Sequence, residues 1–370
     1  MDIECLEDLT EAQKTEWCEF LSTSQHQHPR QHPQFAEVDK AIGNRVIFAT
    51  GRRAGRLVAV GIFVLQPSRV MPGRSAAAVA LSGPVCDTAS DMVAFLQGLS
   101  EHPAFSRTDA LRITPYWLDQ DGDGLARALA QAGFRISDPE PHRDTGLIDL
   151  TGTEDELRAS FSRSARRKVR LVDKSEIEIR TAGTLAEAET FFERLNSLVV
   201  ARHNLTPVSR AEYSAGFDRI FRDGALGVIL CAYHQAVFLG GLLLYRSGTT
   251  AHARRYVADP GAAQAIGNLR VAPALWLEGM FWAKRAGCTR FDVEGFLPVE
   301  DKAHPNFNVY EYKREFKPTH ARRIAEHTLA LSPAHHFANT LPGRLKAHVK
   351  RSFPQLRNLH PARLFPRGGN

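Results

Sequence analysis

The order of predicted helices and strands is the same in the two halves of this 370-residue chain. In each half, helices are followed by a meander of apolar strands, then by one helix and a further strand. RLVAVGIFVLQ (56–66) and AVFLGGLLLYR (236–246) are two of the strand runs. The last long helix has Pro273 near its first turn and Gly287 at its end. The sequence therefore predicts an α/β or α+β fold of two similar domains, in which each half closes around its own sheet.

The chain divides into two predicted domains and a tail. We expect a first domain over residues 1–150, a second over residues 151–332 and a basic tail over residues 333–370. Residues 331–370 carry seven Lys or Arg and no Asp or Glu, so the net charge of +6 lies in the tail. Apolar residues recur there every fourth position, at Phe337, Leu341, Leu345, Val349 and Phe353. This basic amphipathic pattern fits contact with the inner membrane face, binding of tRNA phosphates, or a helix packed on the second domain.

Composition excludes several classes of protein. With 43% hydrophobic and 24% charged residues the chain is globular, and no run of 18 apolar residues predicts a membrane-spanning helix. The N-terminus lacks the pattern of a signal peptide. The five cysteines form no CxxC pair, so we expect reduced thiols in a cytoplasmic protein. The segment QHQHPRQHPQF (25–35) contains three histidines, but its prolines and the lack of a carboxylate favour a surface loop. No metal site is predicted.

A basic helix is predicted near the start of the second half. Within residues 158–174, Arg163, Arg166, Arg167 and Arg170 fall on one helical face. Guanidinium groups on one face can bind a diphosphate through bidentate contacts. A solvated basic face paired with nearby acids is the alternative.

The segment NVYEYKREFKP (308–318) follows FDVEGF (291–296) and suggests one wall of a site. As an extended segment it would place Tyr310 and Tyr312 on one face and Lys313 on the other. A lysine beside an acyl-transfer centre stabilises the oxyanion of a tetrahedral intermediate. Asp292 and Glu294 end a predicted strand, as candidate bases or groups that orient an acceptor, or as salt-bridge partners.

A coenzyme A site is only weakly indicated. Enzymes of the GNAT acetyltransferase class bind the pyrophosphate of acetyl-CoA at the N-terminus of a helix, after a glycine-rich loop. QAIGNLR (264–270) begins like that loop, but Asn268 and Leu269 stand where a second small residue is expected.

Several segments together resemble the Fem-type (FemABX) aminoacyl-tRNA-dependent peptidyltransferases, also known as peptidoglycan bridge-forming enzymes. Their order and spacing across about 290 residues carry the resemblance. The segments are LSGPV (81–85), LRITP (111–115), AGF (132–134), GLIDLTGTEDELRASFSRSARRKVRLVDK (146–174), RRYVADP (254–260), APALWLEGMFWAKRAGCTRFDVEGF (272–296) and VYEYKREFKP (309–318).

The resemblance implies two tandem GNAT-like (BioF2-like) acyltransferase domains. It also implies transfer of an aminoacyl group from aminoacyl-tRNA to an amine of a UDP- or lipid-linked cell-wall precursor, without metal or coenzyme A. Fem-type proteins often carry a coiled-coil arm in the second domain, and no heptad segment of that length occurs here. We therefore expect the compact form, which also suggests roles in exopolysaccharide or envelope biosynthesis.

The resemblance also assigns residues. Lys313 is similar to the lysine of the family's Y-x-F/Y-K-x-x-F-G motif, with Tyr312 at an aromatic position, although Lys317 replaces its glycine. Tyr256 resembles a substrate-contacting tyrosine. The basic helix, with Arg166, Lys168 and Arg170, resembles the contact with the acceptor phosphate.

Two other functions remain open on the sequence. An acyl-CoA-dependent GNAT N-acyltransferase would act on an amino sugar or small amine. A non-catalytic protein of the same fold would use its basic patches to hold nucleic acid or a glycolipid.

Overall fold

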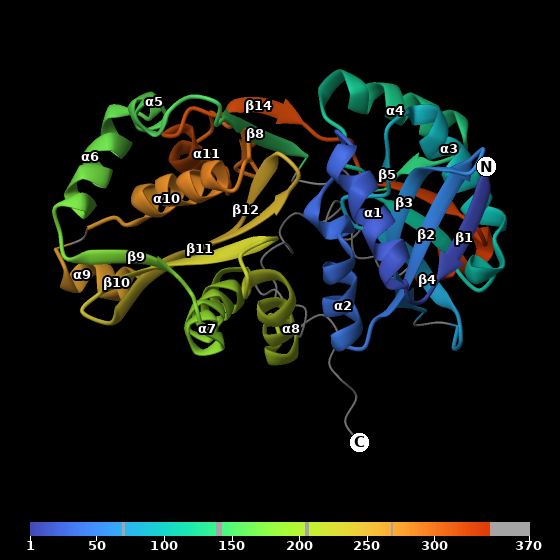
Figure 1. Cartoon of the computed structure of the whole chain (residues 1–370), viewed down its shortest axis with the longest axis horizontal. Coiled ribbons are helices and arrows are strands. Elements are labelled where there is room, and N and C mark those ends of the chain that lie inside the picture. Colours follow the sequence, from blue (N-terminus) through green and yellow to red (C-terminus); the bar gives the residue numbers. More distant parts are fainter. Residues whose placement is uncertain (69–70, 138–142, 204–206, 268, 341–370) are drawn as a thin grey trace.

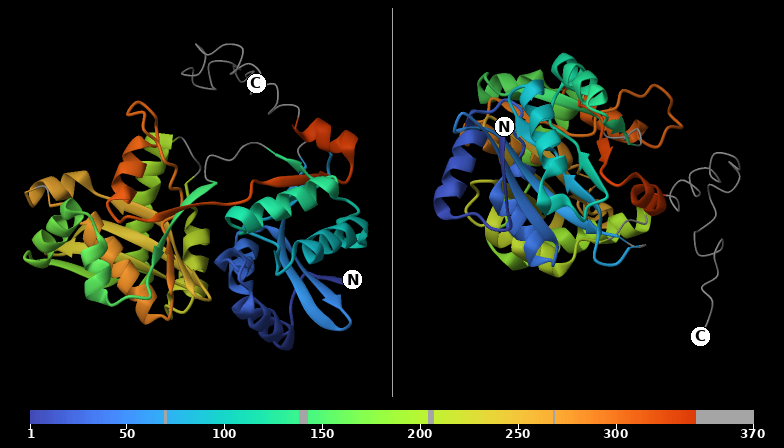
Figure 2. Two further views of the ribbon diagram at one scale, coloured as in Figure 1. Left: turned by 90° about the horizontal axis from the view of Figure 1, so that it is seen from above. Right: turned by 90° about the vertical axis from the view of Figure 1, so that its right-hand side faces the viewer.

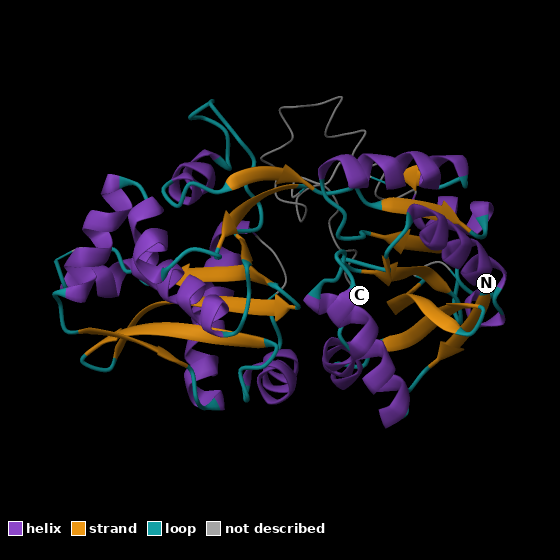
Figure 3. Cartoon of the chain, turned by 45° about the horizontal axis from the view of Figure 1, so that its top comes forward, coloured by secondary structure: helices purple, strands orange, loops and turns teal. Residues whose placement is uncertain are grey.

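The computed structural model describes residues 1–68, 71–137, 143–203, 207–267 and 269–340, and these form two sheets with helices on both faces (Figures 1 and 3). The first sheet has the strand order β1-β2-β3-β4-β6-β15-β7, with β5 paired to β3. Its strands are β1 (Asp2–Leu6), β2 (Arg45–Arg53), β3 (Arg56–Pro67), β4 (Ser75–Ala80), β5 (Val85–Cys86), β6 (Ala110–Ile113), β7 (Arg135–Ile136) and β15 (His327–Ala330).

The second sheet repeats this plan in the order β14-β8-β13-β12-β11-β10-β9. In both sheets an antiparallel meander leads to a helix, after which a strand pairs in parallel with the last meander strand: β6 with β4, and β13 with β12. The predicted duplicated α+β plan is confirmed. The strands are β8 (Asp144–Asp149), β9 (Ile177–Thr181), β10 (Gly227–His234), β11 (Val237–Ser247), β12 (Thr250–Ala258), β13 (Arg290–Asp292) and β14 (Thr319–Arg322).

Apolar side chains pack helices onto both faces of each sheet. In the first domain, α3 and α4 bury Phe95 and Leu125 on one face, and α1 and α2 bury Trp17 and Ala36 on the other. In the second, α10 buries Trp276 opposite α7 and α8. The helices are α1 (Glu11–Thr23), α2 (Pro33–Ala41), α3 (Ala89–Glu101), α4 (Asp119–Gln131), α5 (Glu154–Ser160), α6 (Arg163–Asp173), α7 (Leu185–His203), α8 (Arg210–Gly216), α9 (Pro260–Ala265), α10 (Ala272–Arg285) and α11 (Phe307–Arg314).

The chain crosses between the two sheets twice. β8, expected in the first domain, pairs with β13 and β14 in the second sheet. After β14 the chain returns, and β15 inserts between β6 and β7 of the first sheet (Figure 2). The expected boundaries at residues 150 and 332 therefore do not coincide with the sheets. Periodicity cannot show this, because it describes an element and not its partner.

The segment between α1 and α2 lies between the domains. Phe35 of α2 packs into the second-domain core around α8, while its neighbour Ala36 packs into the first. Gln27 accepts a hydrogen bond from Ser247 at 2.7 Å. The prediction of a surface loop over 25–35 is wrong, because His28 is buried and Pro33 begins a helix.

Two local predictions also differ from the structure. The predicted basic helix within 158–174 is divided between two helices, because Ser162 caps the start of α6. The segment 308–318 is helical and not extended: α11 spans Phe307–Arg314, and the spacing of Tyr312 and Phe316 brings both rings onto Trp276.

None of the helices in the described parts of the chain is both long and apolar enough to cross a membrane. Residues 333–340 form a helix on the first domain, where the Asn339 amide donates to Asp109 at 2.9 Å, so the expected packing of this part on the second domain is wrong. The rest of the basic tail, with Leu341, Leu345, Val349 and Phe353, lies outside the described residues, so contact with the inner membrane face and binding of tRNA phosphates stay predictions.

The position of β15 predicts that the first domain depends on the end of the chain. A protein ending at Arg322 would leave the edges of β6 and β7 unpaired and remove Ile324 from the core. We expect its melting temperature to fall by at least about 5 °C relative to a protein ending at Thr340. Equal melting curves, followed by circular dichroism, would contradict this topology.

Candidate functional site

The candidate site lies where β12 and β13 separate. The two strands pair in parallel over three positions only, from Thr250 with Arg290 to His252 with Asp292. β12 then continues to Ala258, whereas the segment after β13 turns away at Glu294 and Gly295, which have φ of 44° and 52°. The parallel pair thus opens into a split, and the side chains at its closed end come from both domains.

Asp292 holds this closed end together. Its side chain is fully buried and accepts hydrogen bonds from the Tyr116 hydroxyl at 2.6 Å, the Glu294 N–H at 2.7 Å and the Thr145 hydroxyl. Tyr116 belongs to the first domain, so this carboxylate joins the domains. Burial, together with the carboxylate of Asp292, raises the pKa of the Tyr116 hydroxyl well above its ordinary value. Asp292 is therefore surrounded by donors, which suits a positioning role better than that of a base.

Glu294 is an ionised carboxylate beside Asp292. Burial acts to raise its pKa, but the positive charges of Arg254 and Arg323, and a 3.0 Å hydrogen bond from Arg254, outweigh burial and lower the pKa to about 2. Arg254 comes from β12, on the other side of the split. This ion pair therefore joins the two diverging strands.

Lys313 reaches the same point from α11. Its Nζ donates to the carbonyl oxygens of Glu294 and Gly295, the second at 3.2 Å. Burial lowers the pKa of Lys313 to about 8, although the charges of Glu294 and Asp292 act in the opposite direction. Three of the predicted site residues, Lys313, Asp292 and Glu294, thus lie together around one turn of the chain.

Aromatic rings form a wall next to Lys313. Tyr312 of α11 stacks on Tyr256 of β12 with ring centroids 6.0 Å apart, and the lysine amine lies 5.9 Å from the centre of the Trp276 ring. The Tyr312 hydroxyl and the Trp276 indole N–H are buried without a hydrogen-bond partner among the described residues. Such groups are normally paired, so a bound molecule could supply their partners. The structure therefore brings Tyr256 and Tyr312 to the site.

The basic helix α6 lies at the outer side of the second domain (Figure 1). Lys168 makes an ion pair of 2.7 Å with Glu315, just after α11. Arg166 is half-buried, with its Nε lacking a partner within the described chain, and Arg170 is exposed. Of these three residues, Lys168 alone is linked to α11 through Glu315, and the contact of all three with an acceptor phosphate stays a prediction.

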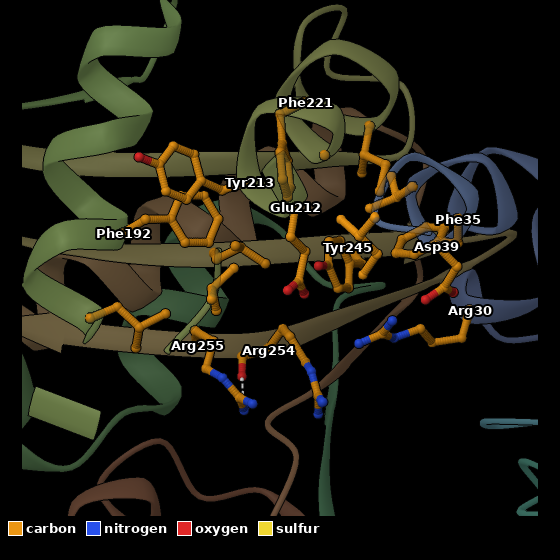
Figure 4. A pocket seen from close by; sticks show the side chains of 17 residues that line it. Arg30, Phe35, Asp39, Phe192, Glu212, Tyr213, Phe221, Tyr245, Arg254 and Arg255 are labelled. Carbon is orange, nitrogen blue, oxygen red and sulfur yellow. Dashed lines mark hydrogen bonds between the residues drawn. The ribbon is translucent and has the colours of Figure 1, made fainter. Parts of the chain in front are cut away.

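A cleft between the domains adjoins this site through Arg254 (Figure 4). It has a cavity volume of about 100 Å³ and lies between α2, α7, α8 and strands β11 and β12. Arg30, Arg254 and Arg255 line it together with Asp39 and Glu212, whose pKa values burial raises. Three guanidinium groups thus face two carboxyl groups in the cleft, and one of the three, Arg254, is also paired with Glu294.

The loop proposed for coenzyme A differs from a pyrophosphate site. The short helix α9 ends at Ala265, and the turn that follows it includes Gly267, with φ of 72°. Asn268 lies outside the described residues. Pro273 occupies the first turn of α10 and has no N–H to donate. The helix terminus thus presents one donor fewer to a phosphate.

Sequence reasoning missed His28, Arg30, Tyr116, His252 and Arg254. Their side chains meet only through the contact of the two domains. Two of these residues, His28 and Arg30, lie in the histidine-rich segment 25–35. Its unusual composition was a signal, but the segment was interpreted as a loop.

The contact of Tyr116 with Asp292 predicts a stabilising role for one hydroxyl. Tyr116→Phe removes a buried donor to a carboxylate, which should lower the free energy of unfolding by about 1.5–3 kcal/mol. Tyr310→Phe, on half-buried Tyr310 of α11, is the matched control and should change it by much less. Denaturant unfolding measures both, and equal effects would contradict the role given to Asp292.

Comparison with known proteins identifies the fold. Residues 159–314 match the model of the acetyltransferase (GNAT) domain. The crystal structure of FemX superposes with a TM-score of 0.76 and 16% identity, covering 91% of this chain and 100% of FemX. A conserved protein of unknown function from Bacteroides thetaiotaomicron gives a TM-score of 0.56 at 11% identity, covering 88% of this chain and 98% of its own.

A further solved structure is the C-terminal domain (DUF2156) of an Agrobacterium fabrum protein named as a lysylphosphatidylglycerol synthetase. It has a TM-score of 0.51 and 14% identity, and covers 92% of this chain and 98% of its own. No curated protein matches the sequence. The GNAT match supports an acyltransferase. The chain thus has the two-domain fold of FemX, as the sequence resemblance predicted, and residues 159–314 are similar to the GNAT acetyltransferase domain.

Proposed function

We propose that this protein transfers an aminoacyl group from aminoacyl-tRNA to an amine of a UDP- or lipid-linked cell-envelope precursor. The observation that carries the proposal is the buried amine of Lys313, held at the closed end of the split by the carbonyl oxygens of Glu294 and Gly295. That position lies beside a basic interdomain cleft and an aromatic wall, where two substrates can meet.

The chemistry needs positioning more than activation. The acceptor nitrogen attacks the ester carbon of the aminoacyl group, the bond to the ribose oxygen breaks, and that oxygen takes up the proton released by the amine. Negative charge develops on the carbonyl oxygen in between, and protonated Lys313 stabilises it. Holding both reactants in place supplies much of the rate, and no covalent acyl-enzyme is required.

The cleft suits an anionic acceptor. Arg30 approaches from the first domain, and Arg254 and Arg255 approach from β12 (Figure 4). Arginine is well suited to phosphate and carboxylate groups, both of which UDP- and lipid-linked precursors can carry. We infer that the precursor binds along this cleft and extends its amine toward Lys313, with the basic helix and tail as further phosphate contacts.

Two features favour aminoacyl-tRNA over acyl-CoA as donor. Pro273 removes one N–H donor from the N-terminus of α10, which would hold the pyrophosphate. The stacked rings of Tyr256 and Tyr312 lie beside the part of β12 that continues past its pairing with β13. The alternative is an acyl-CoA-dependent N-acyltransferase of an amino sugar or small amine, and the GNAT match over residues 159–314 favours it.

A donor assay separates the two functions. Purified protein is incubated with an envelope extract and either radiolabelled aminoacyl-tRNA or labelled acetyl-CoA. We expect label transfer from the tRNA only, abolished by ribonuclease. Lys313→Met, which keeps the aliphatic stem, should reduce the rate about 10²–10³-fold, as does loss of a donor to an oxyanion. Lys302→Ala, at an exposed lysine, is the control and should leave it unchanged. Transfer from acetyl-CoA alone would contradict the proposal.

The lowered pKa of Lys313 predicts the pH dependence. The amine is charged below a pKa of about 8 and neutral above it, so stabilisation of the oxyanion should fade as the pH rises through 8. We expect the transfer rate, corrected for spontaneous ester hydrolysis, to fall there in the native protein. Lys313→Arg keeps its charge, so any activity it retains should not fall in this range. A native rate that rises through pH 8 would instead indicate that the neutral amine acts as a base.

A further inference from the structure

Two histidines and a glutamate meet at the junction of the domains. His28 comes from the segment between α1 and α2, His252 from β12, and Glu294 from the turn after β13. One nitrogen or oxygen atom from each lies within 4.8 Å of the other two. Both histidines are almost entirely inaccessible, at 3% and 0% exposed, and their ring centroids are 4.6 Å apart.

The ring nitrogens of this cluster lack partners. Nε2 of His28 and both Nδ1 and Nε2 of His252 are buried without a hydrogen bond within the described residues. Buried polar groups in proteins are nearly always paired with protein, water or an ion, so three such atoms in one place require an explanation. The function proposed above uses neither histidine.

We propose that His28, His252 and Glu294 bind a divalent transition-metal ion such as Zn²⁺. Imidazole nitrogens and a carboxylate oxygen are ligands that zinc prefers, and three protein ligands with one open position form a recurrent zinc site. This proposal is independent of the donor or acceptor of the transfer reaction.

A neighbouring carboxylate supports the orientation of one of the two rings. Asp292 Oδ2 lies 3.7 Å from His252 Nδ1, where a carboxylate can orient the ring so that Nε2 faces the ion.

Two contacts oppose metal binding and limit its strength. Arg254 bonds to Oε2 of Glu294 at 3.0 Å, so a positive charge lies next to the site. Nδ1 of His28 accepts the Arg30 N–H at 3.2 Å, and binding through Nε2 would place the ring proton on Nδ1 and open that contact. Ligand atoms about 2.0–2.2 Å from zinc also lie nearer to one another than 4.8 Å, so the side chains must close around the ion.

An ion bound by these three residues would link the two domains. His28 belongs to the first domain, and His252 and Glu294 extend from the second sheet. A bound ion would stabilise the closed arrangement of the cleft and would place its charge on the side chain of Glu294, whose own carbonyl group and that of Gly295 accept from Lys313. A buried water could satisfy the same nitrogens, but it would show no selectivity for metals.

Metal titration of the full chain tests the proposal. The protein, without a histidine tag, is stripped with a chelator and titrated with Zn²⁺ against a competing indicator, and with Co²⁺ while visible absorption is recorded. We expect one ion per chain, a cobalt spectrum typical of tetrahedral nitrogen and oxygen ligands, and a higher melting temperature with Zn²⁺. His28→Gln and Glu294→Gln should each weaken binding at least about tenfold. His26→Gln, which alters a ring stacked on Trp117, is the matched control and should not.

Binding of less than a tenth of an equivalent by the native protein would overturn the proposal, as would equal affinity in His28→Gln and His26→Gln. Circular dichroism establishes that each variant is folded. If a variant fails to fold, the native titration and its cobalt spectrum decide the question alone.

Discussion

The carboxylate of Asp292 is the interaction on which the rest of the structure depends. It ends the short strand β13 and accepts bonds from Tyr116 of the first domain, Thr145 of β8 and the backbone N–H of Glu294. A buried charge is tolerated only when donors surround it, so the domain contact and the turn at Glu294 stabilise one another. That turn then fixes the carbonyl groups that receive Lys313.

The duplicated fold supplies two different things to the site. The second sheet opens between β12 and β13, and helix α11 brings Lys313 and Tyr312 to the opening. The first domain contributes Tyr116 and Arg30, which lie outside the second sheet. Strand β15, from the C-terminal part of the chain, pairs with β6 and so completes the first sheet. A single domain of this type would have the split but not the basic cleft beside it.

Much of the fold could be predicted from sequence because its elements are long and strongly patterned. The repeated order of meander, helix and strand was visible, and so was Lys313 after the strand that ends at Asp292. The partners of β8 and β15 could not be predicted, since pairing depends on the contact of remote segments. The helical form of 308–318 was missed because aromatic–lysine mixtures fit a strand as well. His28 was assigned to the surface because its carboxylate neighbour lies 266 positions later in the chain.

The central claim is that Lys313 contacts the carbonyl group undergoing transfer. The most direct test is a crystal structure of the protein with a hydrolysis-resistant 3′-aminoacylamino analogue of the tRNA terminus. The account predicts that the carbonyl oxygen of the analogue lies within hydrogen-bond distance of Lys313 Nζ, about 2.7–3.1 Å, between the aromatic wall and the cleft. An analogue bound away from the split, with Lys313 still bonded only to Glu294 and Gly295, would contradict it.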